Sequence, residues 1–352
     1  MNPHRILVVN PGSTSTKLAL FVDDERAEGV SLRHDVGDLG KFRSVWDQFE
    51  FRLSICREWV CAHVRGASAV VGIGGLLRSL EGGTYVVSAK MIADARSNIQ
   101  GEHASNLGCA LADQLARDFG CPSYVVDPVS VDEFECLARY SGHPLIQRRS
   151  LSHALSIHAA AQRAAQELDL PLVNSSFVIA HLGGGISVAP VLAGRIIDVN
   201  DASSDGPFSP ERTGGLPLQP FISICFSGKY NEQEIRSMVM GKGGMVGYLG
   251  TNSMEDIEKR IEEGDQIARE VHEAMAYQIA KEIGAMATVL RGGVNAIVLT
   301  GGLAASHRLT SLISERVQFI SPVLVYAGDD EMNALALGAL RVLQGIEEAK
   351  EY

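Results

Sequence analysis

The chain has 352 residues, of which 46% are hydrophobic and 21% charged, and these ordinary values exclude a disordered chain, a coiled coil and a collagen-like repeat. Forty-two acidic residues against 31 basic ones give a formal net charge of −11 without a basic block, so we expect no nucleic-acid partner. No apolar run reaches the ~18 residues of a spanning helix, so we expect no membrane partner, and the length predicts about two domains.

The first predicted element is a strand at residues 5–9, and this pattern is typical of a strand of a folded domain rather than of a signal peptide. Six scattered cysteines without a Cys-x-x-Cys pair favour free thiols in a reducing compartment. We therefore expect a cytoplasmic protein.

A turn at residues 10–17, Asn-Pro-Gly-Ser-Thr-Ser-Thr-Lys, follows this strand and leads into a second strand at 18–22. Successive backbone N–H groups in a tight turn form a concavity for anions, and Lys17 adds a positive charge. The spacing is not that of the phosphate loop Gly-x-x-x-x-Gly-Lys-Ser/Thr, and no helix follows. A polar hairpin tip without a ligand therefore remains the alternative.

The second half of the chain repeats this pattern. A strand at 177–180 leads into His181-Leu182-Gly183-Gly184-Gly185, and a further strand follows at 186–191. Three consecutive glycines cost conformational entropy, which a close approach of a ligand to the backbone accounts for. The repeat indicates a duplicated domain whose two tips face each other across a cleft, although two unrelated strand–glycine turns also look alike.

Helical periodicity is clear at 107–115, 151–165, 267–290 and 332–343, and the third of these helices is about 35 Å long. Strands at 124–127 and 296–299 alternate with them, so the fold class is α/β. Because Ser141-Gly142-His143-Pro144 reads as a turn, we expect domains at 1–150 and 151–330 in close contact. The C-terminal segment 331–352 is expected to pack back onto the first.

Several polar groups stand where chemistry is common. Arg212 lies in a long irregular run, 198–217, and suits bidentate binding of an anion, although a solvated surface arginine is the alternative. Asp127 follows an apolar strand, where α/β folds place catalytic carboxylates. The acidic run 328–331 precedes a helix, so its side chains could cap the N-terminus of that helix or bind a magnesium ion. No pair of histidines has the spacing of a zinc site.

Together these motifs resemble the paired signatures of the acetate and butyrate kinases, in the superfamily of sugar kinases, Hsp70 and actin. The signatures are Asn-x-Gly-Ser-Thr-Ser-x-Lys at 10–17 and His-x-Gly-x-Gly-x-Ser at 181–187. Further blocks resemble the butyrate kinase branch, so that the resemblance covers essentially the whole chain. These blocks lie at 81–85, 102–108, 126–129, 206–212, 225–230, 299–303 and 330–332.

The resemblance implies two duplicated α/β domains of the actin, Hsp70 and ribonuclease H type flanking an active-site cleft, usually in a homo-oligomer. It also implies a reversible kinase that converts ATP and a short-chain carboxylate, butanoate or a related acid, to ADP and an acyl phosphate. Mg²⁺ is the implied cofactor. The implied partners are small molecules, the carboxylate and ATP or ADP.

The resemblance also assigns roles to single residues. Arg212 and His153 resemble the pair that stabilises the transferring phosphoryl group, and Asp127 is assigned to catalysis with them. Mg²⁺ is assigned to Asp127 and Glu331. The residues assigned to nucleotide and phosphate binding are Asn10, Ser13, Ser15, Lys17, His181, Gly183, Gly184, Gly185, Gly301 and Gly302. Those assigned to the carboxylate substrate are Arg78, His103 and Asn106.

Ile73 departs from the family pattern, because an Arg that resembles the holder of the substrate carboxylate normally stands there. A charge-assisted contact is worth ~1.5–3 kcal/mol, so its loss weakens catalysis roughly tenfold to a hundredfold or more unless another cation replaces it. Arg78 is a candidate for that replacement. Two alternatives follow: a nucleotide-binding paralogue with weak or no kinase activity, and a kinase for a longer or branched acid whose tail packs on Ile73.

Overall fold

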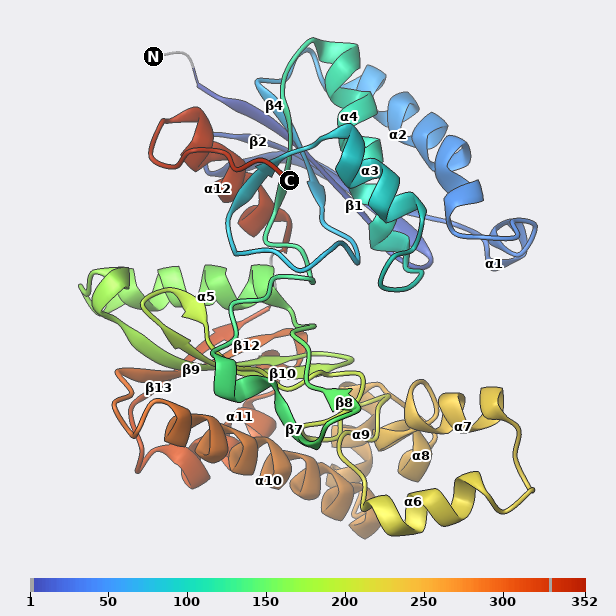
Figure 1. Ribbon diagram of the computed structural model, residues 1–352, viewed down its shortest axis with the longest axis vertical. Coiled ribbons are helices and arrows are strands. Elements are labelled where there is room, and N and C mark those ends of the chain that lie inside the picture. The colour runs from blue at the N-terminus through green and yellow to red at the C-terminus, as the bar shows by residue number, and fades with distance from the viewer. Residues whose placement is uncertain (1–2, 329–330) are drawn as a thin grey trace. The chain divides into compact units, whose positions relative to one another are not determined.

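The structure is a computed structural model that describes residues 3–328 and 331–352 (Figure 1). Its described residues divide into two compact units, the first formed by 3–132 with 331–352 and the second by 133–328. Both units have an α/β architecture in which helices pack on a mixed sheet.

The first unit is built on six strands in the order β3-β2-β1-β4-β6-β5. Strands β1 to β3 form an antiparallel meander, β4 and β6 run parallel to β1, and β5 is antiparallel at the edge. Their bounds are β1 (Arg5–Pro11), β2 (Ser15–Val22), β3 (Glu25–Arg33), β4 (Ala69–Ile73), β5 (Thr84–Val86) and β6 (Ser123–Val126).

Alternation along β1 divides the side chains of this sheet between two faces. Leu7 and Val9 join an apolar core with α2 and α4, whereas α12 contacts β1, β4 and β6. The C-terminal residues continue beyond α12, and Lys350 hydrogen-bonds with the backbone of β5. The helices are α1 (Val36–Leu39), η1 (Trp46–Gln48), α2 (Phe49–His63), α3 (Ala89–Arg96), η2 (Ala104–Leu107), α4 (Gly108–Phe119) and α12 (Glu331–Leu343).

The sheet of the second unit repeats this order as β11-β10-β9-β12-β13, with a β9–β10 hairpin and β12 parallel to β9. This matching topology confirms the duplicated α/β architecture that the sequence repeat predicts. The strands are β9 (Ser176–Leu182), β10 (Ile186–Leu192), β11 (Arg195–Ile196), β12 (Ala296–Gly301) and β13 (Val323–Ala327), and a separate hairpin holds β7 (Tyr140–His143) and β8 (Ile146–Gln147).

Helix α5 contacts β9 and β12, and the long α10 contacts β9 and β10. Val178, Ala180 and Leu182 of β9 share an apolar core with Met275 and Ile279 of α10, which confirms the predicted amphipathic helix. The remaining elements are η3 (Cys136–Arg139), α5 (Ala154–Glu167), η4 (Leu172–Asn174), α6 (Leu218–Cys225), α7 (Glu232–Val239), α8 (Gly244–Leu249), α9 (Met254–Glu262), α10 (Gln266–Val289), η5 (Gly302–Ala305) and α11 (His307–Val317).

The boundary between the units differs from the one expected after residue 150, because 133–150 belong to the second unit. The Glu133 carboxylate accepts a hydrogen bond from the backbone N–H of Ile196 at 2.7 Å. Arg148 pairs with Asp198 at 2.8 Å. Residues 141–144, expected as the turn that ends the first domain, belong to the β7–β8 hairpin, so hydrogen bonding rather than turn composition decides to which unit this segment belongs.

Two further expectations concern the whole chain. All six cysteines are free, as predicted. In the part of the chain that the structure describes, none of the helices has both the length and the apolar character needed to cross a membrane.

Candidate active site

Two histidines stack in the second unit. His153 precedes the first turn of α5, and His181 lies near the end of β9. Their ring centroids are 4.0 Å apart with an interplanar angle of 15°. Ser187 of β10 lies directly opposite His181, and its hydroxyl is 2.9 Å from His153 Nδ1. The contact with Ser187 therefore fixes the orientation of the His153 ring.

Both histidines are neutral near pH 7. Burial lowers the pKa of His181 to about 4. For His153, burial is again the largest cause of a pKa well below the usual value, and the neighbouring His181 and Arg212 lower it further. A charged ring in this environment would lose its hydration and face a second positive charge, so the neutral form is favoured.

Arg212 supplies a permanent positive charge in this cluster. It lies on an irregular stretch, as predicted, and its Nη1 donates to the carbonyl of Ala202 at 3.1 Å. The guanidinium rests on the backbone of Gly185, because a Cβ added there would lie 2.3 Å from Nη1. Glycine at 185 therefore leaves the space that this guanidinium occupies.

The turn between β9 and β10 is shaped by further close contacts. Ser209 Oγ donates to the carbonyl of Gly184 at 2.6 Å, and a Cβ at Gly183 would lie 3.2 Å from His181 Nε2. At the end of β12, Gly301 has φ +92° and a Cβ there would lie 2.4 Å from the carbonyl oxygen of Leu182. Gly302 begins η5, with no heavy atom within 4 Å of an added Cβ.

The structure thus brings the predicted residues of the second unit into one cluster: His153, His181, the Gly183–Gly185 turn and Arg212, with Gly301 beside Leu182. Sequence reasoning missed Ser187 and Ser209. Ser187 ends the signature at 181–187 and Ser209 lies in the block at 206–212, but the motifs assign neither a role, because their contacts are made across strands or from a distant loop.

In the first unit, Asn10 and Lys17 lie opposite each other in the β1–β2 hairpin. The side chains of directly paired residues project to the same face of the sheet. Helix α12 contacts β1 on this face. The Asn10 amide donates to Glu331 Oε2 at 2.8 Å. Ser13 and Lys17 are exposed and Ser15 is partly exposed, so the predicted phosphate-binding tip is accessible.

Asp127 follows β6 in a left-handed conformation, with φ +40°, and is buried. Its Oδ1 accepts a hydrogen bond from the N–H of Gly83 at 2.7 Å. A non-glycine residue held in this region costs of order 1–3 kcal/mol, and such strain concentrates at functional sites. Because β1, β4 and β6 are parallel, Asp127 and Asn10 both lie toward the carboxyl-terminal ends of these strands.

The donor chemistry fits Mg²⁺, which takes oxygen ligands from one or two carboxylates and retains waters or phosphate oxygens for the rest. Asp127, Glu331 and the amide of Asn10 supply oxygen donors of that kind. Within 3–328 and 331–352, no group of three or more His, Cys, Asp or Glu side chains is arranged to enclose a metal by itself. Asp329 and Asp330, part of the acidic run noted in the sequence, lie outside the described residues.

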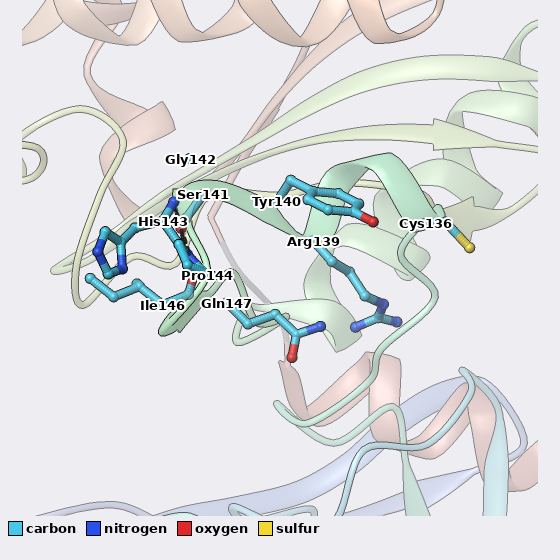
Figure 2. A pocket seen from close by; sticks show the side chains of 9 residues that line it. All are labelled: Cys136, Arg139, Tyr140, Ser141, Gly142, His143, Pro144, Ile146 and Gln147. Atoms are coloured by element: carbon cyan, nitrogen blue, oxygen red, sulfur yellow. Dashed lines mark hydrogen bonds between the residues drawn. The ribbon is translucent and has the colours of Figure 1, made fainter.

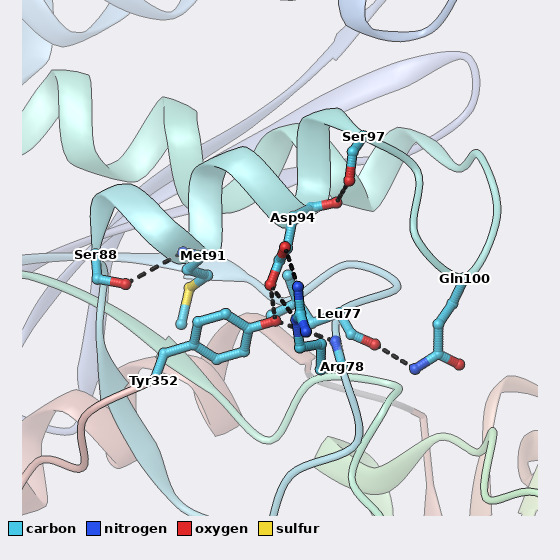
Figure 3. A network of polar contacts seen from close by, with 8 residues as sticks. All are labelled: Leu77, Arg78, Ser88, Met91, Asp94, Ser97, Gln100 and Tyr352. Atoms are coloured by element: carbon cyan, nitrogen blue, oxygen red, sulfur yellow. Dashed lines mark hydrogen bonds and ion pairs between the residues drawn. The ribbon is translucent and has the colours of Figure 1, made fainter.

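Arg78 makes an internal ion pair (Figure 3). Its Nε and Nη2 donate to the two carboxylate oxygens of Asp94 at 2.6 and 3.0 Å. The Tyr352 hydroxyl donates to Asp94 and accepts from the backbone N–H of Arg78. The hydrogen bond from Arg78 lowers the pKa of Asp94. Because this ion pair directs the Arg78 guanidinium toward α3, Arg78 is a weaker candidate to replace the carboxylate-binding arginine that is absent at Ile73.

Asn106 is also engaged within the protein. Its side-chain carbonyl accepts from the N–H of Leu76 at 2.9 Å, and its amide donates to Asn98 and Gly101 at 3.0 Å each. Asn106 therefore supports the loop that follows Ile73. His103 is exposed, and its Nδ1 lies 2.8 Å from the hydroxyl of Ser105 at the start of η2.

A hollow of about 730 Å³ lies elsewhere, beside the β7–β8 hairpin (Figure 2). Tyr140, His143 and Ile146 are among the residues that line it. None of the residues assigned to chemistry contributes to this hollow, so it does not mark the candidate active site.

Comparison with known proteins identifies the relatives of this chain. The model of the acetokinase family matches residues 139–339. A probable butyrate kinase of Listeria monocytogenes is 50% identical over 351 residues, 99% of each chain. Butyrate kinase 2 of Clostridium acetobutylicum is 46% identical over 353 residues, again 99% of each.

Solved structures agree on the fold. An acetate kinase from Porphyromonas gingivalis has a TM-score of 0.79 at 19% identity, with 97% of this chain and 100% of that chain covered. A propionate kinase from Francisella tularensis has a TM-score of 0.74 at 18% identity, with coverage of 95% and 98%.

The full-length relatives define the class of protein, a phosphotransferase, and its fold is built from two α/β units of matching topology. More particularly, the chain belongs to the acetokinase family. The resemblance seen in its motifs is thereby confirmed, and the enzyme is a kinase that uses a short-chain carboxylate as acceptor.

Proposed function

We propose that this chain is a butyrate-type kinase that transfers the γ-phosphoryl group of ATP to butanoate, or to a related short or branched acid, and also runs in reverse. The observation that carries the proposal is the cluster of His153, His181 and Arg212 on the Gly183–Gly185 turn. The curated relatives named butyrate kinases, aligned over 99% of the chain, support this choice of acid.

The chemistry requires little proton transfer. A carboxylate is already ionised at pH 7 and is the nucleophile, so catalysis depends on in-line positioning and on stabilising the charge of the phosphoryl group. In this proposal Arg212 supplies the positive charge. His153, held at Nδ1 by Ser187, contributes a hydrogen bond from a neutral ring rather than a second cation.

Magnesium belongs to the same proposal. Asp127, Glu331 and Asn10 would hold the ion or its waters, and the exposed hydroxyls and ammonium of the β1–β2 tip would meet the phosphates. When bound, Mg²⁺ supplies charge neutralisation between phosphate oxygens. Asn10 and Glu331 already contact each other at 2.8 Å, so their orientation does not depend on the ligand.

We also propose a cytoplasmic homo-oligomer. Six free cysteines suit a reducing compartment. Several large apolar side chains of the second unit are exposed, among them Leu218 at 72%, Phe226 at 86% and Tyr248 at 70%, and a subunit interface would cover them.

A second candidate function is a nucleotide-binding paralogue with weak or no kinase activity. It is favoured by Ile73, an apolar residue at the end of β4, together with the bidentate pairing that commits Arg78 to Asp94. In that case MgATP binds tightly but is not turned over.

The deciding experiment traps acyl phosphate with hydroxylamine, using MgATP and acids from acetate to hexanoate with isobutyrate. The native chain is compared with Ile73→Arg and, as an apolar control, Ile73→Leu. We expect the native chain to turn over butanoate or isobutyrate, and Ile73→Leu to resemble it. Activity confined to Ile73→Arg would support the paralogue, a preference for hexanoate would support the longer acid, and silence in all three variants would contradict the kinase proposal.

A further inference from the structure

Arg52 is completely buried beneath the tip of the β1–β2 hairpin. It lies in the first turn of α2 with 0% of its surface exposed and is the largest fully buried side chain among the described residues. Arginine is almost never fully buried without a partner of opposite charge. Its position therefore calls for an explanation beyond packing.

The guanidinium binds the inner side of the tip. Nη1 donates to the carbonyls of Gly12 and Ser15 at 2.9 and 3.0 Å, and Nη2 donates to the carbonyl of Ser13 at 3.1 Å. Nε and Nη2 also donate to the side-chain oxygen of Gln48 at 3.0 and 2.9 Å. A planar fork of donors is suited to fixing several acceptors at once.

These bonds give the tip an inner and an outer side. The carbonyl of Thr14 accepts from the N–H of His34 at 2.9 Å, so all four carbonyls from Gly12 to Ser15 are occupied. The N–H groups of Ser13 and Thr14, in contrast, have no hydrogen-bond acceptor among residues 3–328 and 331–352, and both residues are exposed. Outward N–H groups of successive residues form a nest for an anion.

The charge of Arg52 is not neutralised from within. Across the described residues, no carboxylate lies within 4 Å of its guanidinium, and Gln48 is uncharged. The thiol of Cys56 is no counter-ion, because burial raises its pKa to about 12. Burial and the positive charge of Arg52 also lower the pKa of His34, which keeps that ring neutral. An anion at the tip would offset this buried charge.

We propose that Arg52 is a positioning residue for nucleotide phosphate: it holds the tip carbonyls inward, so that the N–H groups of Ser13 and Thr14 face the phosphate, and its uncompensated charge favours the anion. The proposal rests on the proposed function, in which this tip binds ATP. Arg52 itself touches no reacting atom.

Two substitutions separate the geometry from the charge. Arg52→Lys keeps the charge but loses the fork, since one ammonium cannot hold three carbonyls and Gln48 together. Gln48→Glu keeps an acceptor for Nε and Nη2 but adds a negative charge that neutralises the guanidinium. Leu53→Ala is the matched control, because Leu53 is a buried neighbour on α2 that packs in the apolar core.

The full-length variants are compared by MgATP binding in calorimetry, by KM for each substrate, and by thermal unfolding. For Arg52→Lys we expect MgATP affinity and kcat/KM for ATP to fall about tenfold to a hundredfold, the scale of a misplaced binding group. For Gln48→Glu we expect a fold at least as stable and a KM for ATP raised on the order of threefold to tenfold, with KM for the acid nearly unchanged. Leu53→Ala should lose stability without changing MgATP affinity.

The outcomes distinguish this inference from the proposed function. If the native chain forms acyl phosphate, and Gln48→Glu binds MgATP as tightly as the native chain, the inference is overturned and the kinase proposal stands. If the native chain binds MgATP without turnover and Gln48→Glu weakens that binding, the inference stands alone. A native chain that neither binds nor turns over MgATP overturns both. Should Arg52→Lys fail to fold, Gln48→Glu still decides.

Discussion

The contact between Gly185 and Arg212 makes the sharpest prediction, through the substitution Gly185→Ala. The added methyl group would lie 2.3 Å from Nη1 and 2.7 Å from Cζ of Arg212. Gly185 does not have a left-handed backbone conformation, so alanine introduces no strain in the chain itself. The cheapest response is a displacement of the guanidinium, which is the far end of a flexible side chain.

The size of the effect follows from that displacement. An ordinary contact begins at 3.4 Å, so the guanidinium must move by about 1 Å, and misplacement on that scale costs up to ~10²-fold in rate. Loss of a charge-assisted hydrogen bond, worth ~1.5–3 kcal/mol, gives a similar range of about tenfold to 150-fold. Stability should change by less than about 1 kcal/mol, because the turn itself is not overpacked.

The assay is kcat/KM for ATP in acyl phosphate formation, with urea unfolding measured in parallel. The decisive comparison places Gly185→Ala in an Arg212→Ala background, where we expect it to change kcat/KM by less than about twofold. Gly184→Ala is the matched control, since its methyl group meets no atom within 4 Å, and any effect it has should persist without Arg212. Additive losses from Gly185→Ala and Arg212→Ala would refute the reasoning.

Two further predictions concern stability. Burial raises the pKa of Asp205 from 3.8 to about 6, so its destabilising contribution develops as pH rises from about 4 to 6. Asp205→Asn should therefore raise the free energy of unfolding by up to about 3 kcal/mol at pH 7 and by almost nothing at pH 4, and urea titrations that show equal effects at both pH values would contradict this. Tyr352→Phe removes the hydroxyl shared by Asp94 and the backbone of Arg78, which should cost about 1–2 kcal/mol in the same titration at pH 7. An unchanged midpoint would show that the C-terminal residue does not stabilise this loop.

Sequence patterns predicted the parts of the fold that depend on local periodicity. The strand–turn–strand repeat at 5–22 and 177–191 corresponds to the two hairpins, and the long amphipathic helix corresponds to α10. The error at residue 150 has a different origin. A turn-rich segment is equally compatible with a linker and with a hairpin tip, and only hydrogen bonds to residues some fifty positions away, such as Arg148 to Val199 at 3.0 Å, distinguish the two.

The site divides in the same way. Glycine-rich turns are visible in the sequence because glycine is itself the signal. No sequence signal distinguishes Arg52, because it is one arginine in a helix that also carries Arg57. Its acceptors Gly12, Ser13 and Ser15 lie about forty residues earlier in the chain. Arg57 pairs with Asp118 on the surface. Only the packing of α2 under the hairpin distinguishes these two arginines.

The histidine stack illustrates why residue identity alone does not fix electrostatics. A histidine beside a phosphoryl group invites the assumption of a cation, yet two rings 4.0 Å apart, both buried and near Arg212, cannot both be charged without severe repulsion. With the pKa of His181 at about 4, the pair gains protons only in acid, and protonation there favours the unfolded chain, whose histidines titrate near 6.5. Positive charge in this cluster therefore comes from Arg212, and it does not vary across the pH range in which carboxylates are nucleophiles.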